Sequence, residues 1–153
     1  MGQPLKKKPW LLRKTVLPQH TDHAGIMWHG SYLNWLEESR INALSQAGLS
    51  YSNISENGYE MPVVEVSIKY QSSLNHGDEV ILKSWLLDSE GARLPWKTVF
   101  IKECGKPSAE AIVHLVTLKR IDSGLRIVRR FPDEISKALE NLRQGPTKDS
   151  LDI

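Results

Sequence analysis

A helical spacing of apolar residues dominates the first third of the chain. The apolar positions recur at intervals of three and four, at Leu33, Leu36, Ala43, Leu44 and Ala47. Such intervals are typical of a helix with one buried face, which Tyr32 and Trp35 widen. Ser31 is a favourable N-cap, and Gly48 is a favourable residue just after the helix end. The pattern predicts a helix of roughly 17 residues that starts close to His29 or Ser31 and is largely covered by other elements.

The period of the apolar pattern changes to two after position 62. Alternating apolar and polar residues fill the segments 63–71, 79–87, 94–102 and 109–118, with turn-forming residues between them. This pattern is typical of antiparallel strands that have one face in the core. Pro95 predicts that the third of these strands begins at a sheet edge or a bulge. Residues 50–60 show neither period, and we expect them to be irregular.

The order of the predicted elements indicates the fold class. A strand at 11–17 precedes the long helix, and a second helix is predicted over 131–142, where Pro132 and acidic residues suit a helix start. A strand, a long helix and then four strands joined by short turns predict an α+β domain, in which a curved antiparallel sheet wraps around one central helix. Such a sheet favours pairing with a second copy. We expect flexible tails on both sides of one domain, with the boundaries 1–9, 10–143 and 144–153.

Composition narrows the class of protein. The chain is 40% apolar and 25% charged, which argues against a disordered protein, and no apolar run approaches the roughly 20 residues that span a bilayer. A net charge of +2 is too small to favour nucleic-acid binding. The basic run at residues 6–8 is not followed by the apolar stretch of a secretory signal, so we expect a cytoplasmic protein. Cys104 is the only cysteine, which excludes an intrachain disulfide.

The candidate chemistry lies in the loop before the long helix. Within ten positions this loop holds His20, Asp22, His23 and His29, whose charge and hydrogen bonding can be tuned near neutral pH. The helix start behind them offers unpaired backbone N–H groups and the positive end of the helix dipole, which can stabilise a developing oxyanion. A carboxylate beside such a site indicates hydrolysis of an activated acyl group.

The same loop resembles the signature of a known enzyme family. Its residues run Thr21-Asp-His-Ala-Gly-Ile-Met-Trp-His-Gly-Ser-Tyr-Leu-Asn-Trp-Leu-Glu37. They resemble the pattern of the hot-dog fold thioesterases of the 4-hydroxybenzoyl-CoA thioesterase type, which is Asp-x-x-Gly, two hydrophobic residues and an aromatic one, then a tyrosine and an acidic residue on the helix. His20 and Trp28-His29-Gly30 are most similar to the branch that hydrolyses 1,4-dihydroxy-2-naphthoyl-CoA in phylloquinone or menaquinone biosynthesis. A weaker resemblance extends over most of the chain.

The resemblance implies roles for individual residues. Asp22 matches the catalytic carboxylate, which is either the nucleophile on the thioester carbonyl or the general base for water. The backbone N–H of His29 matches the donor that polarises the thioester oxygen, and Glu37 matches an acidic residue near the acyl pocket. The other substrate contacts that we expect are at Gly25, Trp28, Tyr32 and Arg93. A pocket for a flat aromatic acyl group would be lined by large side chains, such as Met27, Trp28, Trp35 and Trp85.

The resemblance also implies the partners of the protein. An acyl-CoA is the expected substrate and a homodimer or homotetramer the expected assembly, with no cofactor, metal, nucleic acid or membrane involved. Some family members hold the CoA phosphates with a basic cluster at the start of a strand, where this chain has only Arg93, with Lys97 further along. Lys119, Arg129 and Arg130 are additional candidates on charge alone.

Other interpretations of the same residues stay open. Asp22 would close an Asx turn in a purely structural loop, or it would bind a metal with the three histidines, although their spacing matches no metal motif. Glu37 and Arg40 lie three positions apart on the predicted helix and would pair with each other. At the level of function, the alternatives are a hot-dog hydratase or dehydratase acting on acyl thioesters and a non-catalytic module that binds an acyl or aromatic ligand.

Overall fold

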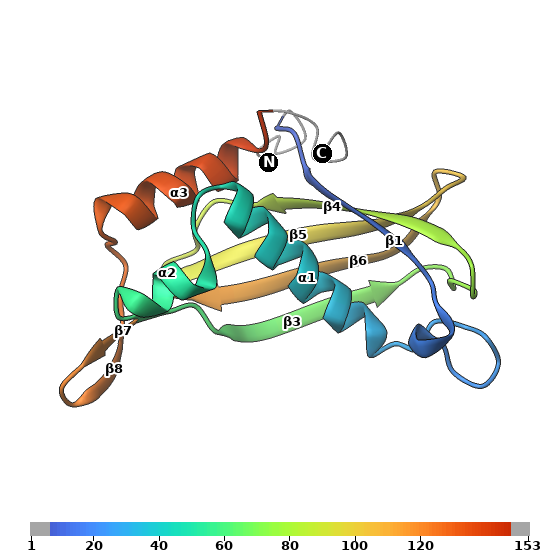
Figure 1. Cartoon of the computed structure of the whole chain (residues 1–153), viewed down its shortest axis with the longest axis horizontal. Helices are drawn as coiled ribbons and strands as arrows, with labels where there is room; N and C mark the ends of the chain where they lie inside the picture. The colour runs from blue at the N-terminus through green and yellow to red at the C-terminus, as the bar shows by residue number, and fades with distance from the viewer. Residues whose placement is uncertain (1–6, 148–153) are drawn as a thin grey trace.

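One antiparallel sheet and one long helix form the centre of the fold (Figure 1). The structure is a computed structural model, and it describes residues 7–147. Helix α1, Ser31–Gln46, crosses one face of the sheet. The strand order is β1-β4-β5-β6-β3, with the bounds β1 Trp10–Thr15, β3 Val63–Tyr70, β4 Glu79–Leu86, β5 Arg93–Lys102 and β6 Pro107–Val116.

The core fills the space between α1 and the sheet. Alternate residues of β4 and β6 are buried, because only one side of each strand faces the helix. Trp35 of α1 is buried, and so are Trp96 and Phe100 of β5. Ser39 of α1 lies 3.1 Å from Ser84 of β4, so these two buried hydroxyl groups are hydrogen-bonded to each other. The predicted α+β hot-dog arrangement, with a curved antiparallel sheet around one central helix, is confirmed.

The smaller elements lie around one end of the sheet (Figure 1). A second sheet has the strand order β2-β7-β8, with the bounds β2 Tyr59–Glu60, β7 Leu118–Ile121 and β8 Gly124–Ile127. Helix α3, Asp133–Gln144, confirms the predicted second helix. Trp10 of β1 donates from Nε1 to the Leu142 carbonyl at 2.8 Å, which ties α3 to the first strand. The β7–β8 hairpin lies beyond the start of β3, whereas the loop that holds Asp22 lies beyond its end.

The prediction that residues 50–60 are irregular is wrong. They contain helix α2, Tyr51–Glu56, and strand β2. Ser50 is the N-cap of α2, and its Oγ accepts the Asn53 N–H at 3.2 Å. Elements of six and two residues are too short for a hydrophobic period to show. Only the capping serine could have indicated a helix start here.

Helix α1 ends as predicted, but its first turn differs from the prediction. Gly48 follows its C-terminus with a φ of +99°, the conformation that favours glycine. At the other end the cap residue is Gly30, and Ser31 is the first helical residue. The Ser31 hydroxyl donates to the His20 carbonyl at 3.0 Å and so fixes the loop to the helix start. Leu33 is 48% exposed, so the buried face of α1 is narrower than the apolar stripe in the sequence.

Pro95 lies in a central strand, whereas the sequence predicts an edge or a bulge. Strand β5 lies between β4 and β6, and Pro95 is opposite His114 of β6. The Pro95 carbonyl accepts the Leu87 N–H at 2.9 Å, so the Pro95 nitrogen also faces the β4 side. Because β4 ends at Leu86, the hydrogen bond that Pro95 cannot donate would lie just beyond the end of β4, so the pairing of the two strands is kept.

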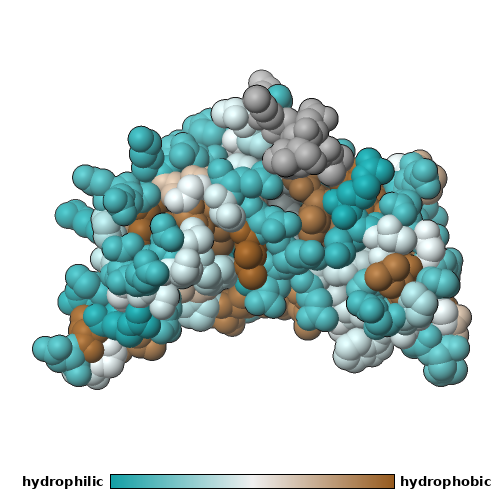
Figure 2. Space-filling view, viewed as in Figure 1, coloured by the Kyte–Doolittle hydropathy of each residue, from teal (hydrophilic) through white to brown (hydrophobic). Residues whose placement is uncertain are grey.

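Strand β3 is an outer strand with an open edge. Val63, Val64, Val66 and Tyr70 are between 39% and 51% exposed, although the alternating pattern predicts a half-buried strand. Figure 2 shows hydrophobic residues among the polar ones along the lower border of the molecule, where β3 runs in Figure 1. Gln71 donates its N–H to the Ser108 carbonyl of β6 at 2.9 Å. Because backbone groups alternate in direction along a strand, those of Val66 and Tyr70 face the open edge. Such an edge is a surface that another chain can cover.

The predicted tails are described only in part. Residues 1–6 and 148–153 lie outside the described range. Helix α3 continues to Gln144, one residue beyond the predicted end of the domain. Among the helices that the structure describes, none combines the length and the apolar character that a membrane span requires.

Candidate active site

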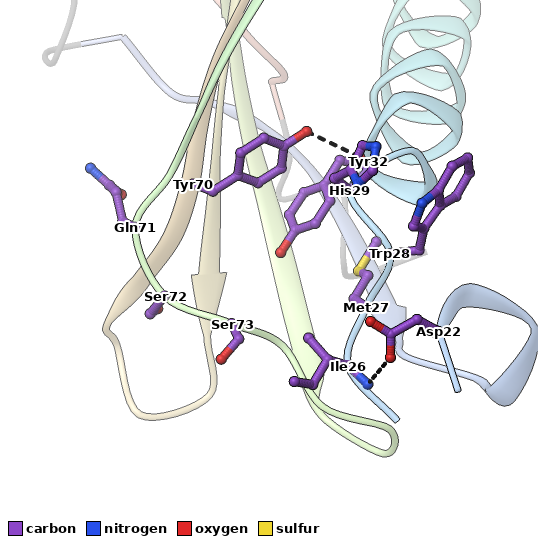
Figure 3. Close-up of a pocket in the computed structure, with 10 residues that line it drawn as sticks. All are labelled: Asp22, Ile26, Met27, Trp28, His29, Tyr32, Tyr70, Gln71, Ser72 and Ser73. Atoms are coloured by element: carbon purple, nitrogen blue, oxygen red, sulfur yellow. Dashed lines mark hydrogen bonds between the residues drawn. The ribbon is translucent and has the colours of Figure 1, made fainter. Parts of the chain in front are cut away.

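A cavity of about 410 Å³ lies between the loop before α1 and the end of β3 (Figure 3). The loop lines it with Asp22, Ile26, Met27, Trp28 and His29, helix α1 with Tyr32, and the end of β3 and the turn after it with Tyr70, Gln71, Ser72 and Ser73. The structure therefore brings four of the predicted site residues, Asp22, Trp28, His29 and Tyr32, to one cavity.

Asp22 is held in place by one of its two carboxylate oxygens. Oδ1 accepts the N–H of Ala24 at 2.9 Å and that of Ile26 at 3.2 Å, which forms the Asx turn of the structural interpretation. Gly25 follows with a φ of +78°, so the loop can fold back on the carboxylate. Oδ2 accepts no hydrogen bond from residues 7–147. One oxygen thus fixes the side chain, and the other is free to act on a ligand.

The backbone N–H of His29 is an unpaired donor at the same cavity. The Trp28 carbonyl, on the other side of the same peptide bond, accepts the Ser31 N–H at 2.9 Å. In a trans peptide the N–H and C=O groups point in opposite directions, so the His29 N–H points away from the body of α1. It donates to no acceptor within the described part of the chain. An unpaired N–H at a helix start is what a donor to an oxyanion requires.

Two tyrosines close the cavity on the β3 side. Tyr70 donates its hydroxyl to the His29 carbonyl at 3.1 Å and meets Tyr32 edge to face, with the ring centroids 5.1 Å apart. The Tyr32 hydroxyl points into the cavity (Figure 3), and it has no hydrogen-bond partner among the described residues. Burial, with a smaller effect of Tyr70, raises the pKa of Tyr32 to about 12. Tyr32 therefore offers a neutral hydroxyl to a ligand at physiological pH.

Several predicted contacts do not line the Asp22 cavity, and the first of these is Gly25, which belongs to the loop. Trp35 is buried in the core, and Trp85 lies on β4. Glu37 lines a second cavity, which lies further along α1. Helix geometry explains the position of Glu37, because side chains five positions apart on a helix differ in direction by about 140°. Glu37 and Tyr32 therefore do not face the same cavity within one chain.

The basic residues that were candidates for CoA binding also lie elsewhere. Arg93 opens β5 and binds Glu65 at 2.7 Å, and this hydrogen bond lowers the pKa of Glu65. Arg93 lies near the start of β3, because β3 and β5 are both antiparallel to β6 and therefore begin at the same end of the sheet. The expectation that Arg93 contacts a substrate at Asp22 is not met within one chain. Lys97 pairs with Glu110 at 3.3 Å. The remaining candidates, Lys119, Arg129 and Arg130, lie in β7 and after β8.

His20 takes part in the structure of the loop. Its Nδ1 accepts the Leu17 N–H at 3.0 Å, which places the ring proton on Nε2, and its ring meets Trp35 edge to face at 5.2 Å. Burial and then the charge of Lys14 lower the pKa of His20, against a smaller opposing effect of Glu38. Among residues 7–147, no three side chains of the metal-ligating types are clustered.

Acidification is expected to destabilise the protein through His20. The folded state has the lower His20 pKa, so below the ordinary value of 6.5 the unfolded chain binds more protons, and the free energy of unfolding falls as the pH falls. His20→Asn keeps an acceptor for the Leu17 N–H but does not titrate, so its loss of stability from about pH 7.5 to about pH 5 should be smaller than that of the wild type. Urea denaturation at both pH values measures the difference. His76→Asn, in an exposed turn, is the control, and equal losses in all three proteins would contradict the prediction.

No local pattern in the sequence indicates that Tyr70 and residues 71–73 belong to the site. Tyr70 continues the alternation of its strand, which makes it look like any other core-facing residue. The polar run Gln71-Ser72-Ser73 directly after a strand is the one feature that could have indicated a binding loop. Only the tertiary arrangement places these residues beside Asp22, which lies more than 40 positions earlier.

Comparison with known proteins identifies the family. The family model described as the thioesterase-like superfamily matches residues 16–139. The chain is 32% identical to an inferred esterase of Synechocystis over 131 residues, which are 84% of this chain and 77% of the relative. It is 29% identical to an inferred acyl-CoA thioesterase of Bacillus subtilis over 118 residues, which are 74% of this chain and 83% of the relative. Among solved structures, a 1,4-dihydroxy-2-naphthoyl-CoA thioesterase from Synechocystis has a TM-score of 0.75 at 21% identity, over 87% of this chain and 96% of that chain.

The family match covers the parts of the chain that build the site. Residues 16–139 include the Asp22 loop, α1 and all strands from β2 to β8. A carboxylate oxygen without a hydrogen bond and an unpaired backbone N–H, as at Asp22 and His29 in the described residues, are groups that can act on a thioester. The chain therefore belongs to the thioesterase-like superfamily and is a thioester hydrolase.

Proposed function

We propose that the protein hydrolyses the CoA thioester of a hydroxylated aromatic acid, namely 1,4-dihydroxy-2-naphthoyl-CoA in phylloquinone or menaquinone biosynthesis. The observation that carries this proposal is the free Oδ2 of Asp22 and the unpaired His29 N–H at one cavity. Met27, Trp28 and Tyr32 line that cavity and suit a flat aromatic ring. The solved naphthoyl-CoA thioesterase supports the choice of acyl group through likeness of fold alone.

The two groups act on the two ends of the thioester carbonyl. Asp22 either attacks the carbonyl carbon, forming an anhydride that water then opens, or takes a proton from the water that attacks. In both routes negative charge develops on the carbonyl oxygen, to which the His29 N–H donates, and such a donor contributes roughly 3 kcal/mol in the transition state. The bond from the carbonyl carbon to sulfur breaks, and the products are the aromatic acid and the CoA thiol.

The active assembly in this proposal is a dimer joined along β3. The open edge of β3 exposes three valines and Tyr70, and Leu33 and Ile41 of α1 are 48% and 38% exposed. A second copy that pairs antiparallel with this edge would satisfy the free backbone groups of β3 and cover these side chains. Such a contact is a two-fold one, which closes the assembly at two copies. A homotetramer would need a further contact between dimers.

Thiol release from a panel of acyl-CoAs tests the proposed function. The panel contains 1,4-dihydroxy-2-naphthoyl, 4-hydroxybenzoyl, benzoyl and straight-chain thioesters, and the naphthoyl substrate should have the highest kcat/KM, by about tenfold or more. Cleavage of straight-chain substrates alone would leave the chemistry in place and exclude the aromatic substrate. Tight acyl-CoA binding in calorimetry without any thiol release would show a non-catalytic binding module instead.

A further inference from the structure

Helix α1 buries a guanidinium group that has no ion-pair partner in the described part of the chain. Arg40 is 6% exposed, and its Nε donates to the Tyr51 hydroxyl at 3.3 Å. The interpretation that Glu37 pairs with Arg40 is wrong for the single chain, because no carboxylate of residues 7–147 lies within 4.0 Å of the Arg40 guanidinium. A buried charge without a counter-charge costs free energy. Among residues 7–147 Arg40 has one acceptor, the Tyr51 hydroxyl, and no counter-charge, so its remaining donors are open to a ligand.

Arg40 lines the second cavity, which has a volume of about 220 Å³ and lies between α1 and β3. Glu37 is the other charged residue at this cavity, and the remaining walls are apolar, formed by Leu33, Leu36, Val63, Val66 and Val113. Apolar walls with one or two polar groups are typical of sites that bind a hydrophobic ligand in a fixed orientation. The cavity suits an apolar group that carries an oxygen atom, since the guanidinium has only hydrogen-bond donors.

Within one chain the two cavities are separate. Tyr32 and Tyr70, whose rings meet edge to face, line the Asp22 cavity but do not line the Arg40 cavity. Val63 and Val66 line the Arg40 cavity, and both are exposed at the open edge of β3. The Arg40 cavity therefore borders the edge where the second copy is proposed to pair.

Pairing along β3 places cavities of different protomers side by side. In an antiparallel two-fold pair, the end of one strand lies beside the start of the other. Tyr70 at the end of β3 lines the Asp22 cavity, and Val63 at its start lines the Arg40 cavity. Because paired strands lie about 4.8 Å apart, the Arg40 cavity of one protomer adjoins the cavity at Asp22 of the partner subunit.

We propose that Arg40 binds an oxygen atom of the acyl group whose thioester is cleaved at Asp22 of the partner subunit. This inference rests on the proposed function and on the pairing along β3. The guanidinium donates to a phenol or phenolate oxygen that is remote from the thioester, in a charge-assisted hydrogen bond. An oxygenated acyl group gives this largely buried charge an acceptor besides the Tyr51 hydroxyl. Arg40 therefore selects hydroxylated aromatic acyl-CoAs over plain aromatic ones.

Matched substrates test this selectivity in an Arg40→Met variant. The ratio of kcat/KM for 4-hydroxybenzoyl-CoA to that for benzoyl-CoA should fall by about ten- to hundredfold relative to the wild type, as expected when a hydrogen bond to a charged group is lost. Arg40→Lys keeps the charge but not the fork of donors, so its ratio should fall less than that of Arg40→Met. It provides the test if Arg40→Met folds poorly. Arg13→Met is the matched control, because Arg13 is exposed on β1 at the opposite edge of the sheet. It should leave the ratio unchanged.

A mixed dimer tests whether the two residues act from different protomers. One subunit carries Asp22→Asn and the other Arg40→Met, and different affinity tags allow the mixed dimer to be purified. One of its two sites then carries both substitutions and the other carries neither. The mixed dimer should recover about half of the wild-type rate on the hydroxylated substrate, far above either parent. A rate no higher than the mean of the two parents would overturn the inference.

Binding separates a failure of this inference from a failure of the proposed function. The probes are the phenacyl and 4-hydroxyphenacyl thioethers of CoA, in which a methylene group separates sulfur from the carbonyl so that no hydrolysis occurs. If the wild type binds the hydroxylated probe about tenfold more tightly and Arg40→Met loses this difference, Arg40 recognises the oxygen even in a protein that cleaves no thioester. If Arg40→Met weakens both probes equally, Arg40 only holds α1 against Tyr51, and the inference fails.

Discussion

Asp22→Asn is expected to lower kcat on the preferred acyl-CoA by about a thousandfold and to leave the fold intact. The amide oxygen of asparagine can accept the N–H groups of Ala24 and Ile26 as Oδ1 of Asp22 does, so the loop keeps its turn. The variant lacks the negative charge on the second oxygen, and loss of such a group typically costs 10²- to about 10⁴-fold in rate. Thiol release at saturating substrate measures kcat. Thermal unfolding measures the fold, and Tm should change by less than about 3 °C.

Two further variants separate the two functions of this carboxylate. Asp78→Asn is the matched control, because Asp78 also accepts a backbone N–H, that of Asn75 at 2.8 Å, but does not line the cavity. It should keep both kcat and Tm. Asp22→Ala leaves the two N–H groups of the turn without an acceptor, so it should lower Tm as well as kcat. Thiol release by Asp22→Asn at the wild-type rate would mean that Asp22 only closes the turn.

Much of the fold could be predicted because it follows from local patterns. Burial of one face imposes a period of three to four on α1 and a period of two on β4, β5 and β6, and all four elements are found within two residues of their predicted bounds. Helix α2 and strand β2 could not be predicted, because they are too short to show a period. The position of Pro95 was mispredicted because the amino-acid type does not reveal where the neighbouring strand ends.

In the candidate site too, some residues could be predicted from the local sequence, and others only from the tertiary structure. The meeting of Asp22 and His29 at one cavity could be predicted because one short loop and the helix start behind it hold both residues. Glu37, Arg93 and Arg40 could not be placed, because their surroundings depend on the rotation of α1 and on strand direction. Glu37 and Arg40 looked like an ordinary pair on one helix. The structure shows instead that Arg40 is buried beside an open sheet edge, with a hydrogen bond to Tyr51 and no carboxylate partner among residues 7–147.

Replacement of both Val64 and Val66 by lysine is expected to separate the protomers and to lower kcat/KM by at least about a hundredfold. Like charges facing each other across a two-fold strand pair oppose its formation, and lysine is a residue that natural proteins use to keep strand edges apart. Both valines are exposed in the single chain, so each subunit should keep its fold. The loss of rate follows because a displacement of site groups by even 1 Å costs on that order. Light scattering gives the molecular mass, circular dichroism the fold and thiol release the rate.

The weaker variant Val64→Lys shows whether the rate depends on the assembly itself. Val66 lines the Arg40 cavity but Val64 lines neither cavity, so the single substitution weakens the edge without changing a wall of the site. Its specific activity should rise with protein concentration and follow the fraction of dimer. Leu17→Lys, at a residue that is 44% exposed outside β3, should remain dimeric and active at all concentrations. A monomeric Val64→Lys protein with the full wild-type rate would mean that Asp22 and His29 act without a partner subunit. Arg40 would then not bind an acyl group that is cleaved at Asp22 of a second copy.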